Sequence, residues 1–353
     1  MMLSHRLEEL ASFVRDLGSE CTCLIIHGDI LIAGSKNGKI VSWNIKDGHE
    51  IWSLEVDGPI SDIEVSDLIY LTASAELHAI EIENGSLKWT QDIGGSSDLI
   101  KVDKESIWVT SSLYEIEVQD YTETTLFRFD KNSKLIKSIV FEERPWFMAI
   151  EGNDLILGIG RPRCGYLIVN SNNEINHEEI SGDSPITLGI KTKSGFLLGH
   201  SNGTMTEIKN KNEQIIKLEN SPITSIIGSD DFWCLGDNKG AILSSNNWKK
   251  NISNRIDCLI EVNDLIWAAA FNNEYRIYLL DRNNGDTKYI VTHDSRIRLM
   301  KHIRGKIAIS DDNGKIILLE EEIVFRRLGE IKETSQNQEK RDLLKKRLRE
   351  LRK

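Results

Sequence analysis

Thiols, imidazoles and carboxylates are the side chains of this sequence that could bind a metal ion or act in catalysis. Cys21 and Cys23 could be two metal ligands, but no second pair of Cys or His follows at a ligand spacing. The acidic pairs Asp230-Asp231 and Asp311-Asp312 fall where turns are expected, and solvated Asp is common in turns. We therefore predict no metal, no cofactor and no catalytic residue. An enzyme whose residues come together from separate parts of the chain is the alternative.

Charge and composition narrow the class of protein. The 353 residues include 44 Lys and Arg against 55 Asp and Glu, a formal net charge of −11, and 40% are apolar. This apolar content is too high for a disordered chain, and no apolar run reaches the roughly 20 residues of a membrane helix. Charges interrupt the first ten residues, and five sparse cysteines are no disulfide framework. These features predict a cytoplasmic protein without a membrane span.

A repeated apolar strand must position the polar residues. The strand follows a polar turn and precedes small residues, and it recurs every 33 to 48 residues, about 40 on average, which is the spacing of propeller blades. Its first apolar residues are Ile30, Leu68, Ile107, Leu155, Phe196, Phe232, Leu265 and Ile307. Asn-Gly or related turns follow several copies, as at Asn37-Gly38 and Asn313-Gly314, and such turns form tight hairpins.

Each repeat is thus a four-stranded antiparallel unit that must stack on its neighbours to bury its faces. We predict an eight-bladed β-propeller over residues 21–329, with short N- and C-terminal helices. A seven-bladed ring is the alternative, because the copy around 97–139 is irregular.

A second repeated pattern, such as Pro59-Ile60-Ser61, lies upstream of several strands and predicts the innermost strand of each blade. If its third position faces the ring axis, the channel is lined by polar side chains. These are Ser61, Thr187, Thr224, Asp257 and Arg298, with Thr22 and Asp98 by a looser alignment. Arg296 shares a strand face with Arg298, and the pair could bind an anion at the channel mouth or form internal ion pairs. The hydroxyls could instead satisfy backbone groups between blades.

Two segments resemble a known repeat. Residues 77–89, which end in Asn84-Gly85-Ser86-Leu87-Lys88-Trp89, and residues 38–52, which end in Trp52, resemble the pyrroloquinoline-quinone-type repeat of the quinoprotein-dehydrogenase-like propellers. The tryptophan–aspartate repeat family is a weaker match. The resemblance implies the fold, since such propellers include both enzymes and scaffolds. It also implies that a quinone enzyme would need a calcium site and often a Cys-Cys neighbour, and this chain has no such neighbour.

Two irregular loops are candidate recognition elements. The segment between Glu115 and Lys137 is longer than its equivalents in the other repeats. The turn 160–165 presents Arg161 and Arg163 around a proline. Loops on a rigid scaffold often carry binding residues, so we interpret both arginines as partner-binding candidates; a merely tolerated insertion is the alternative.

The termini carry leucine stripes. Leu3, Leu7, Leu10, Val14 and Leu17 have heptad-like spacing, which predicts an amphipathic helix over residues 1–18. A polar linker is predicted over 330–338 and a basic helix over 339–353, where eight basic and three acidic residues give a net charge of +5. Leu344, Arg347, Leu348 and Leu351 are its candidate partner-binding residues.

These helices could contact a protein partner or a second copy, or they could cap the ring. The basic tail could also bind nucleic acid. We predict a non-enzymatic protein-interaction scaffold. A quinoprotein-like propeller enzyme with an axial site and a nucleic-acid-associated factor are the two alternatives.

Overall fold

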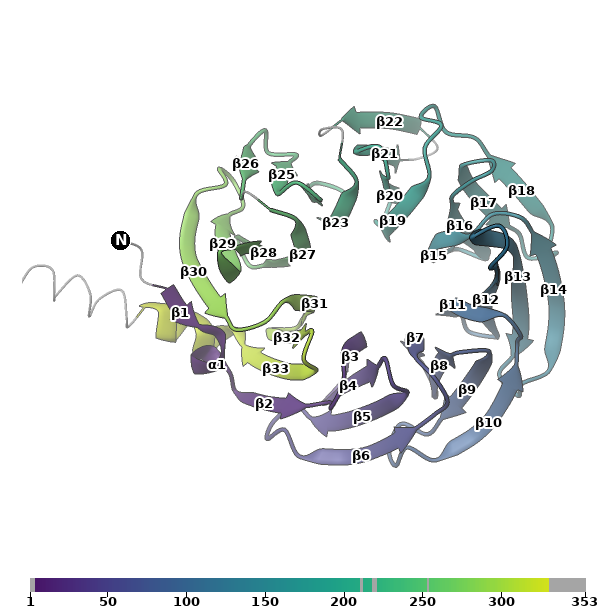
Figure 1. The fold of residues 1–353 in the computed structure, drawn as a ribbon, viewed down its shortest axis with the longest axis horizontal. Coiled ribbons are helices and arrows are strands. Elements are labelled where there is room, and N and C mark those ends of the chain that lie inside the picture. The colour runs from purple at the N-terminus through teal and green to yellow at the C-terminus, as the bar shows by residue number, and fades with distance from the viewer. Residues whose placement is uncertain (1–3, 210–211, 218–220, 253, 330–353) are drawn as a thin grey trace, which may run out of the picture.

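The computed structural model describes residues 4–209, 212–217, 221–252 and 254–329. Within them, β-strands form eight sheets, antiparallel except where β1 joins β30, arranged radially around a central axis (Figure 1). The protein is therefore an eight-bladed β-propeller, as the repeat spacing predicts, and the seven-bladed alternative is wrong. No helix in the described ranges is long and apolar enough to cross a membrane.

The strands of each blade follow one another along the chain, from the axis outwards. The first four blades are β3 (Cys21–His27), β4 (Ile30–Ser35), β5 (Lys39–Asn44) and β6 (Glu50–Glu55); β7 (Ile60–Val65), β8 (Ile69–Ala73), β9 (Glu76–Ile80) and β10 (Leu87–Asp92); β11 (Ser96–Val102), β12 (Ser106–Glu115), β13 (Asp120–Asp130) and β14 (Leu135–Phe141); β15 (Pro145–Glu151), β16 (Asp154–Ile159), β17 (Gly165–Val169) and β18 (Ile175–Glu178).

The next four are β19 (Ile186–Lys191), β20 (Gly195–His200), β21 (Thr204–Lys209) and β22 (Asn212–Lys217); β23 (Ile223–Gly228), β24 (Trp233–Asp237), β25 (Ala241–Ser244) and β26 (Lys249–Asn251); β27 (Ile256–Val262), β28 (Leu265–Asn272), β29 (Glu274–Asp281) and β30 (Thr287–His293); β31 (Ile297–Ile303), β32 (Lys306–Asp311) and β33 (Lys315–Glu320). We number the blades one to eight in this order.

The core lies between adjacent blades. The second strand of a blade is sandwiched by its neighbours, and β8 (Ile69–Ala73) and β20 (Gly195–His200) are buried at every position. Such continuous burial explains why these strands read as unbroken apolar runs in the sequence. The closing Trp52 contacts the next blade, where its indole N–H donates to the Ile82 carbonyl (2.8 Å).

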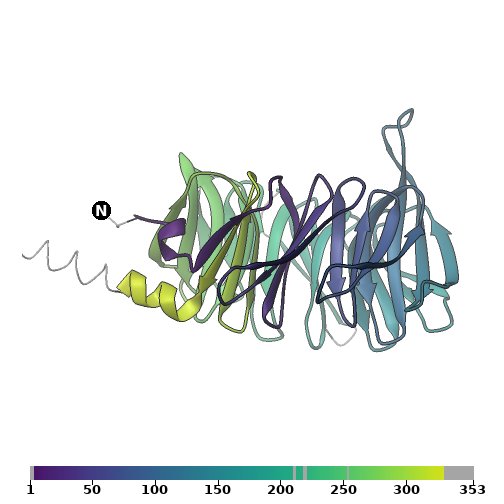
Figure 2. The ribbon, with the colours of Figure 1, turned by 90° about the horizontal axis from the view of Figure 1, so that it is seen from below.

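The irregular repeat is a complete third blade whose middle strands are extended. β12 and β13 have 10 and 11 residues, longer than any other strand described. Their hairpin projects from one face of the ring (Figure 2). The long spacing of this repeat therefore reflects an elongated hairpin rather than a missing blade.

The predicted helix over residues 1–18 is wrong. Residues of this segment form β1 (Ser4–Arg6), the one-turn helix α1 (Leu7–Leu10) and β2 (Phe13–Asp16). β2 is the outermost strand of blade eight, antiparallel to β33, and β1 joins blade seven in parallel with β30. An unpaired edge at β33 would leave backbone groups without partners, so pairing across the ring outweighs a helical stripe of only five apolar residues.

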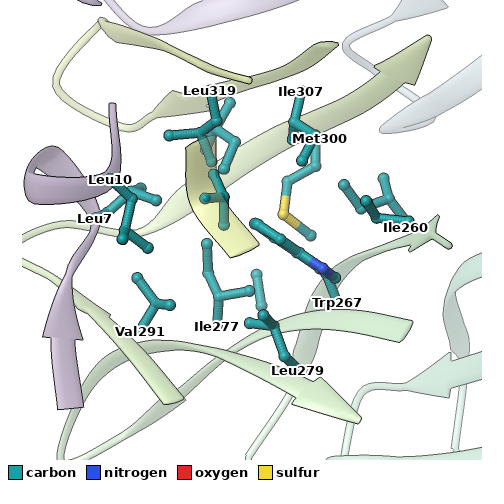
Figure 3. Packing of buried hydrophobic residues seen from close by; sticks show 14 of the residues in the cluster. Leu7, Leu10, Ile260, Trp267, Ile277, Leu279, Val291, Met300, Ile307 and Leu319 are labelled. Atoms are coloured by element: carbon teal, nitrogen blue, oxygen red, sulfur yellow. The ribbon is translucent and has the colours of Figure 1, made fainter. Parts of the chain in front are cut away.

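The end of the described chain packs on this closure. Residues 321–329 are helical, and the buried Val324 and Leu328 belong to the same apolar cluster as Leu7 and Leu10. Figure 3 shows Leu7 and Leu10 in this cluster. The predicted propeller boundary at residue 329 thus includes a short C-terminal helix beyond the last strand. The predicted linker 330–338 and basic helix 339–353 lie outside the described residues.

A polar cluster also fastens the closure. The buried His293 lies between Glu8 of α1 (3.3 Å) and Asp311 of β32 (2.8 Å), and Lys315 also pairs with Glu8 (3.2 Å). Burial raises the pKa of the Asp311 carboxyl, but hydrogen bonds from His293, Ser295 and the Lys315 backbone outweigh it and leave that pKa below its ordinary value. Burial also raises the pKa of Glu8, but hydrogen bonds and nearby positive charge outweigh that effect. The pKa of Glu8 is therefore lowered as well.

A carboxyl group whose pKa is lowered by folding stabilises the fold at pH values above its ordinary pKa. This stabilisation is lost as the pH falls through the lowered pKa. We therefore expect the closure to loosen below about pH 4. Hydrogen exchange, corrected for intrinsic rates, should show the amides of β2 losing about tenfold more protection than those of β24 between pH 6 and pH 3. Equal losses in both strands would show that the cluster does not fasten the ring.

Candidate functional site

The eight inner strands begin on one face of the ring, which we call the upper face. In blade three Ser96 at the start of β11 pairs with Ser112 near the end of β12, so the turns between second and third strands lie on this same face. The β12–β13 hairpin therefore rises from the upper face, uppermost in Figure 2. Of the segments singled out in the sequence, the first part of 115–137 and the turn 160–165 lie at this face.

A β-bulge recurs at the start of every inner strand. In β3 the pairing passes from Cys21 opposite Ser35 to Cys23 opposite Gly34, which leaves Thr22 unpaired. The register shifts at the corresponding place in the other seven blades. The residues at the bulges, which we call the mouth ring, are Thr22, Ser61, Asp98, Trp146, Thr187, Thr224, Asp257 and Arg298. A bulge turns its side chain away from the regular alternation of the strand, and bulges are frequent at barrel rims and binding sites.

The hydroxyls of the mouth ring bond to the backbone. Thr224 donates to the Gly236 carbonyl (3.2 Å) and to Ile256 of the next blade (2.6 Å), and Thr187 makes the same two kinds of contact with Gly199 and Ile223. Ser61 lies 3.3 Å from the Ser97 hydroxyl of the next blade. These hydroxyls join neighbouring blades, which was the structural alternative to a ligand-binding role.

The charged members of the mouth ring form internal ion pairs. Arg296 contacts Asp257 (2.5 Å), and Arg255 approaches the same carboxylate (3.6 Å). Arg298 pairs with Glu20 and with Asp312 (3.2 Å). Except for Asp312, these residues line a hollow of about 260 Å³ at the mouth. The structure therefore brings Arg296 and Arg298 together as the sequence suggests, but both guanidinium groups already have carboxylate partners.

A second hollow, of about 450 Å³, lies deeper between blades one, two, three and eight. Asp62, Glu64, Lys101 and Lys301 line it, and Lys101 pairs with Glu64. Burial raises the pKa of Asp62 and lowers that of Lys101, because both charges are removed from water. Two carboxylates and two amines balance in charge, so this hollow has no net preference for an anion or a cation.

The mouth-ring residues do not fit the calcium ion and the quinone that enzymes with pyrroloquinoline-quinone-type repeats need. The mouth-ring carboxylates Asp98 and Asp257 are each held by an arginine, Arg144 (2.6 Å) and Arg296. No group of three or more His, Cys, Asp or Glu residues in the described ranges is arranged to hold a metal ion. An oxygen-rich cation site needs carboxylates free to coordinate.

The β12–β13 hairpin presents an apolar and acidic tip. Residues 113–120 are all exposed, with Ile116 82% and Val118 60% accessible. Exposed aliphatic side chains concentrated on one projecting element are typical of an interaction surface. Tyr114 and Tyr121 pack edge to face across the hairpin, with ring centroids 5.1 Å apart. The tip therefore has a defined shape as well as an apolar surface.

The base of the hairpin is braced against the mouth ring. The Arg144 guanidinium lies 3.6 Å from the Tyr121 ring centroid and 4.4 Å from that of Trp146, and it forms the ion pair with Asp98. Trp146 is nevertheless 46% exposed. Sequence reasoning missed Trp146, because Pro145 pairs at the position that Ile60 and Ile186 hold in their blades, which shifts the inner-strand pattern of this blade by one residue.

The two arginines of the 160–165 turn differ in their surroundings. Arg163 is engaged by the buried Glu143 through two hydrogen bonds, one of them 2.9 Å, and this lowers the pKa of Glu143 in spite of its burial. Arg161 is exposed and has no ion-pair partner in the described part of the chain. Only Arg161 thus offers a free cation on this turn.

A second aromatic hairpin lies four blades away. At the tip of β28–β29 the rings of Phe271 and Tyr275 are 4.9 Å apart, and Phe271 is 40% exposed. In a ring of eight, blades three and seven stand on opposite sides of the axis (Figure 1). The upper face therefore carries exposed aromatic or aliphatic side chains on both sides of a mouth whose charges are internally neutralised.

The fold is an eight-bladed β-propeller, and the candidate binding features of its upper face lie in its hairpins. Residues 19–137 match the family model described as outer membrane protein assembly factor BamB, which confirms the resemblance to pyrroloquinoline-quinone-type repeats over the first blades. No curated protein sequence matches the chain.

Similar solved structures support the fold. The computationally designed Ika8 protein has a TM-score of 0.72 at 12% identity, covering 87% of this chain and 98% of its own. Sqt1 of Saccharomyces cerevisiae has a TM-score of 0.73 at 13% identity, with coverage of 90% and 99%. BamB from Moraxella catarrhalis has a TM-score of 0.69 at 11% identity, with coverage of 88% and 99%. At such identities these neighbours show a shared fold.

Proposed function

We propose that this protein is a non-enzymatic interaction scaffold that binds a protein partner through its upper face, principally through the β12–β13 hairpin. The observation that carries the proposal is the exposure of Ile116 and Val118 on an element built out from the ring. An apolar tip of this kind gains most by burial against another protein, at about 25 cal/mol per Å² of apolar surface. A phosphate backbone offers no such surface.

The rigidity of the hairpin supports the same function. Because Arg144 holds Tyr121 and Trp146 in one stack, little conformational freedom remains to be lost on binding. The match to a family described as an assembly factor also suits a protein that acts on other proteins. We include a cytoplasmic location in the proposal, because the five cysteines are free thiols and four of them are buried.

A photo-crosslinking amino acid at position 116 tests the proposal in extracts of the source cells. Position 303 is the matched control, because Ile303 is also an exposed isoleucine but lies at the lower end of β31. We expect a discrete protein adduct from position 116, no adduct from position 303, and a weaker adduct when Arg144→Ala loosens the hairpin. Equal products from both positions, or none from position 116, would contradict the proposal.

A further inference from the structure

We infer that the β12–β13 hairpin binds residues 339–353 of a second copy of this chain. The inference rests on the proposed function, since it names the partner of the same hairpin. It depends on charge complementarity, on exposed apolar side chains and on the position at which the described chain ends.

The hairpin supplies the acidic side of this contact. Residues 113–123 contain four carboxylates and no basic residue. The four are Glu115, Glu117, Asp120 and Glu123, all exposed and without an ion-pair partner in the described ranges. Glu115 and Glu117 alternate with the exposed Tyr114, Ile116 and Val118, so negative charge and apolar side chains occur together at the tip. A basic segment with aliphatic side chains would match both properties.

The sequence of residues 339–353 has this chemistry. It contains eight basic and three acidic residues together with four leucines. Lys345, Lys346 and Arg347 form its central basic run, flanked by Leu344 and Leu348. Leucines would be superfluous in a segment that only neutralised phosphates, whereas they suit the apolar hairpin tip. The same chain therefore carries both halves of a complementary pair.

The geometry favours a second copy over the hairpin's own tail. β33 runs from the upper face to the lower face, and the helix 321–329 continues from it, held to the N-terminal segment by Arg327, whose guanidinium donates to the Glu9 carbonyl (2.8 Å). Figure 2 shows this helix low on one side of the ring and the tall hairpin at the opposite side.

Nine residues, 330–338, precede the basic segment and span at most about 30 Å when fully extended. A domain of this length is about 50 Å across. The linker alone therefore does not carry the start of the basic segment across the ring to its own hairpin, and the hairpin of a neighbouring molecule is the complementary surface that the segment meets without spanning the ring.

Sedimentation velocity of the full-length chain at low and high salt tests this inference. We expect reversible self-association that weakens about tenfold or more in high salt, because the contacts are exposed ion pairs. Glu115→Lys with Glu117→Lys should leave a monomer, and so should Lys345→Glu with Lys346→Glu. A mixture of these two variants should associate again, because each reversed hairpin then meets a complementary tail.

The matched control is Glu178→Lys with Glu179→Lys, which makes the same change in net charge at exposed positions of blade four and should leave association unchanged. A wild-type chain that stays monomeric at low salt overturns the inference, and so does a charge-reversed mixture that fails to associate. If position 116 nevertheless crosslinks to a different protein, the scaffold function stands and only the identity of its partner is wrong.

Discussion

Leu10→Ala should lower the free energy of unfolding by about 3 kcal/mol, one of the two largest effects that we expect from a single substitution. Leu10 is 1% exposed and packs with Leu7, Val291, Leu319 and the helix 321–329 (Figure 3). Truncation therefore leaves a cavity where the first and last segments of the ring meet. Denaturant unfolding followed by tryptophan fluorescence measures the loss.

Ile116→Ala is the control for this substitution, because it removes a similar amount of side chain from a position that is 82% exposed, and it should change stability by less than about 0.5 kcal/mol. Hydrogen exchange adds a local readout, since β2 should lose protection before the central strands of other blades. If Leu10→Ala were as stable as Ile116→Ala, the N-terminal segment would not be part of the closed ring.

Gly236→Ala should cost about 2 kcal/mol, because the chain has no room for one extra methyl group at this position. A Cβ on Gly236 would lie 2.6 Å from Cγ2 and 2.7 Å from Cβ of Ile256 in the next blade. Ile256 cannot easily retreat, since the Thr224 hydroxyl donates to its carbonyl (2.6 Å). The same close approach recurs at Gly34, Gly158 and Gly199, each against an isoleucine of the following blade.

Gly182→Ala is the matched control, with the nearest atom 3.7 Å from its added Cβ. Denaturant midpoints of the two variants should differ clearly, while the slopes of the transitions should agree. Similar stability of the two variants would mean that adjacent blades can separate slightly at no cost, which contradicts close packing between them.

Much of the ring could be predicted from local pattern. Seven of the eight blades are built from four consecutive strands joined by short connections, so their hydrogen bonds and spacing are encoded within about 40 residues. The third position of the inner-strand pattern, in Ser61 and Thr187 for example, proves to be the bulged residue at the channel mouth. This position could be found because the bulged residue is polar or charged in seven of the eight blades; Trp146 of blade four is the exception.

The closure of the ring was decided only by the tertiary structure. Five apolar residues with a heptad-like spacing favour a helix, but β2 pairs with β33, about 300 residues later, where an unpaired strand edge would otherwise remain. The partners of charged groups were equally hidden, because Arg163 meets Glu143 and Arg298 meets Glu20 only after folding. Sequence spacing thus determined the number of blades. Contacts between distant segments decided how the ring closes, which arginines stay free and how firmly the β12–β13 hairpin is held, because these depend on which strand edges and charges the closed ring brings together.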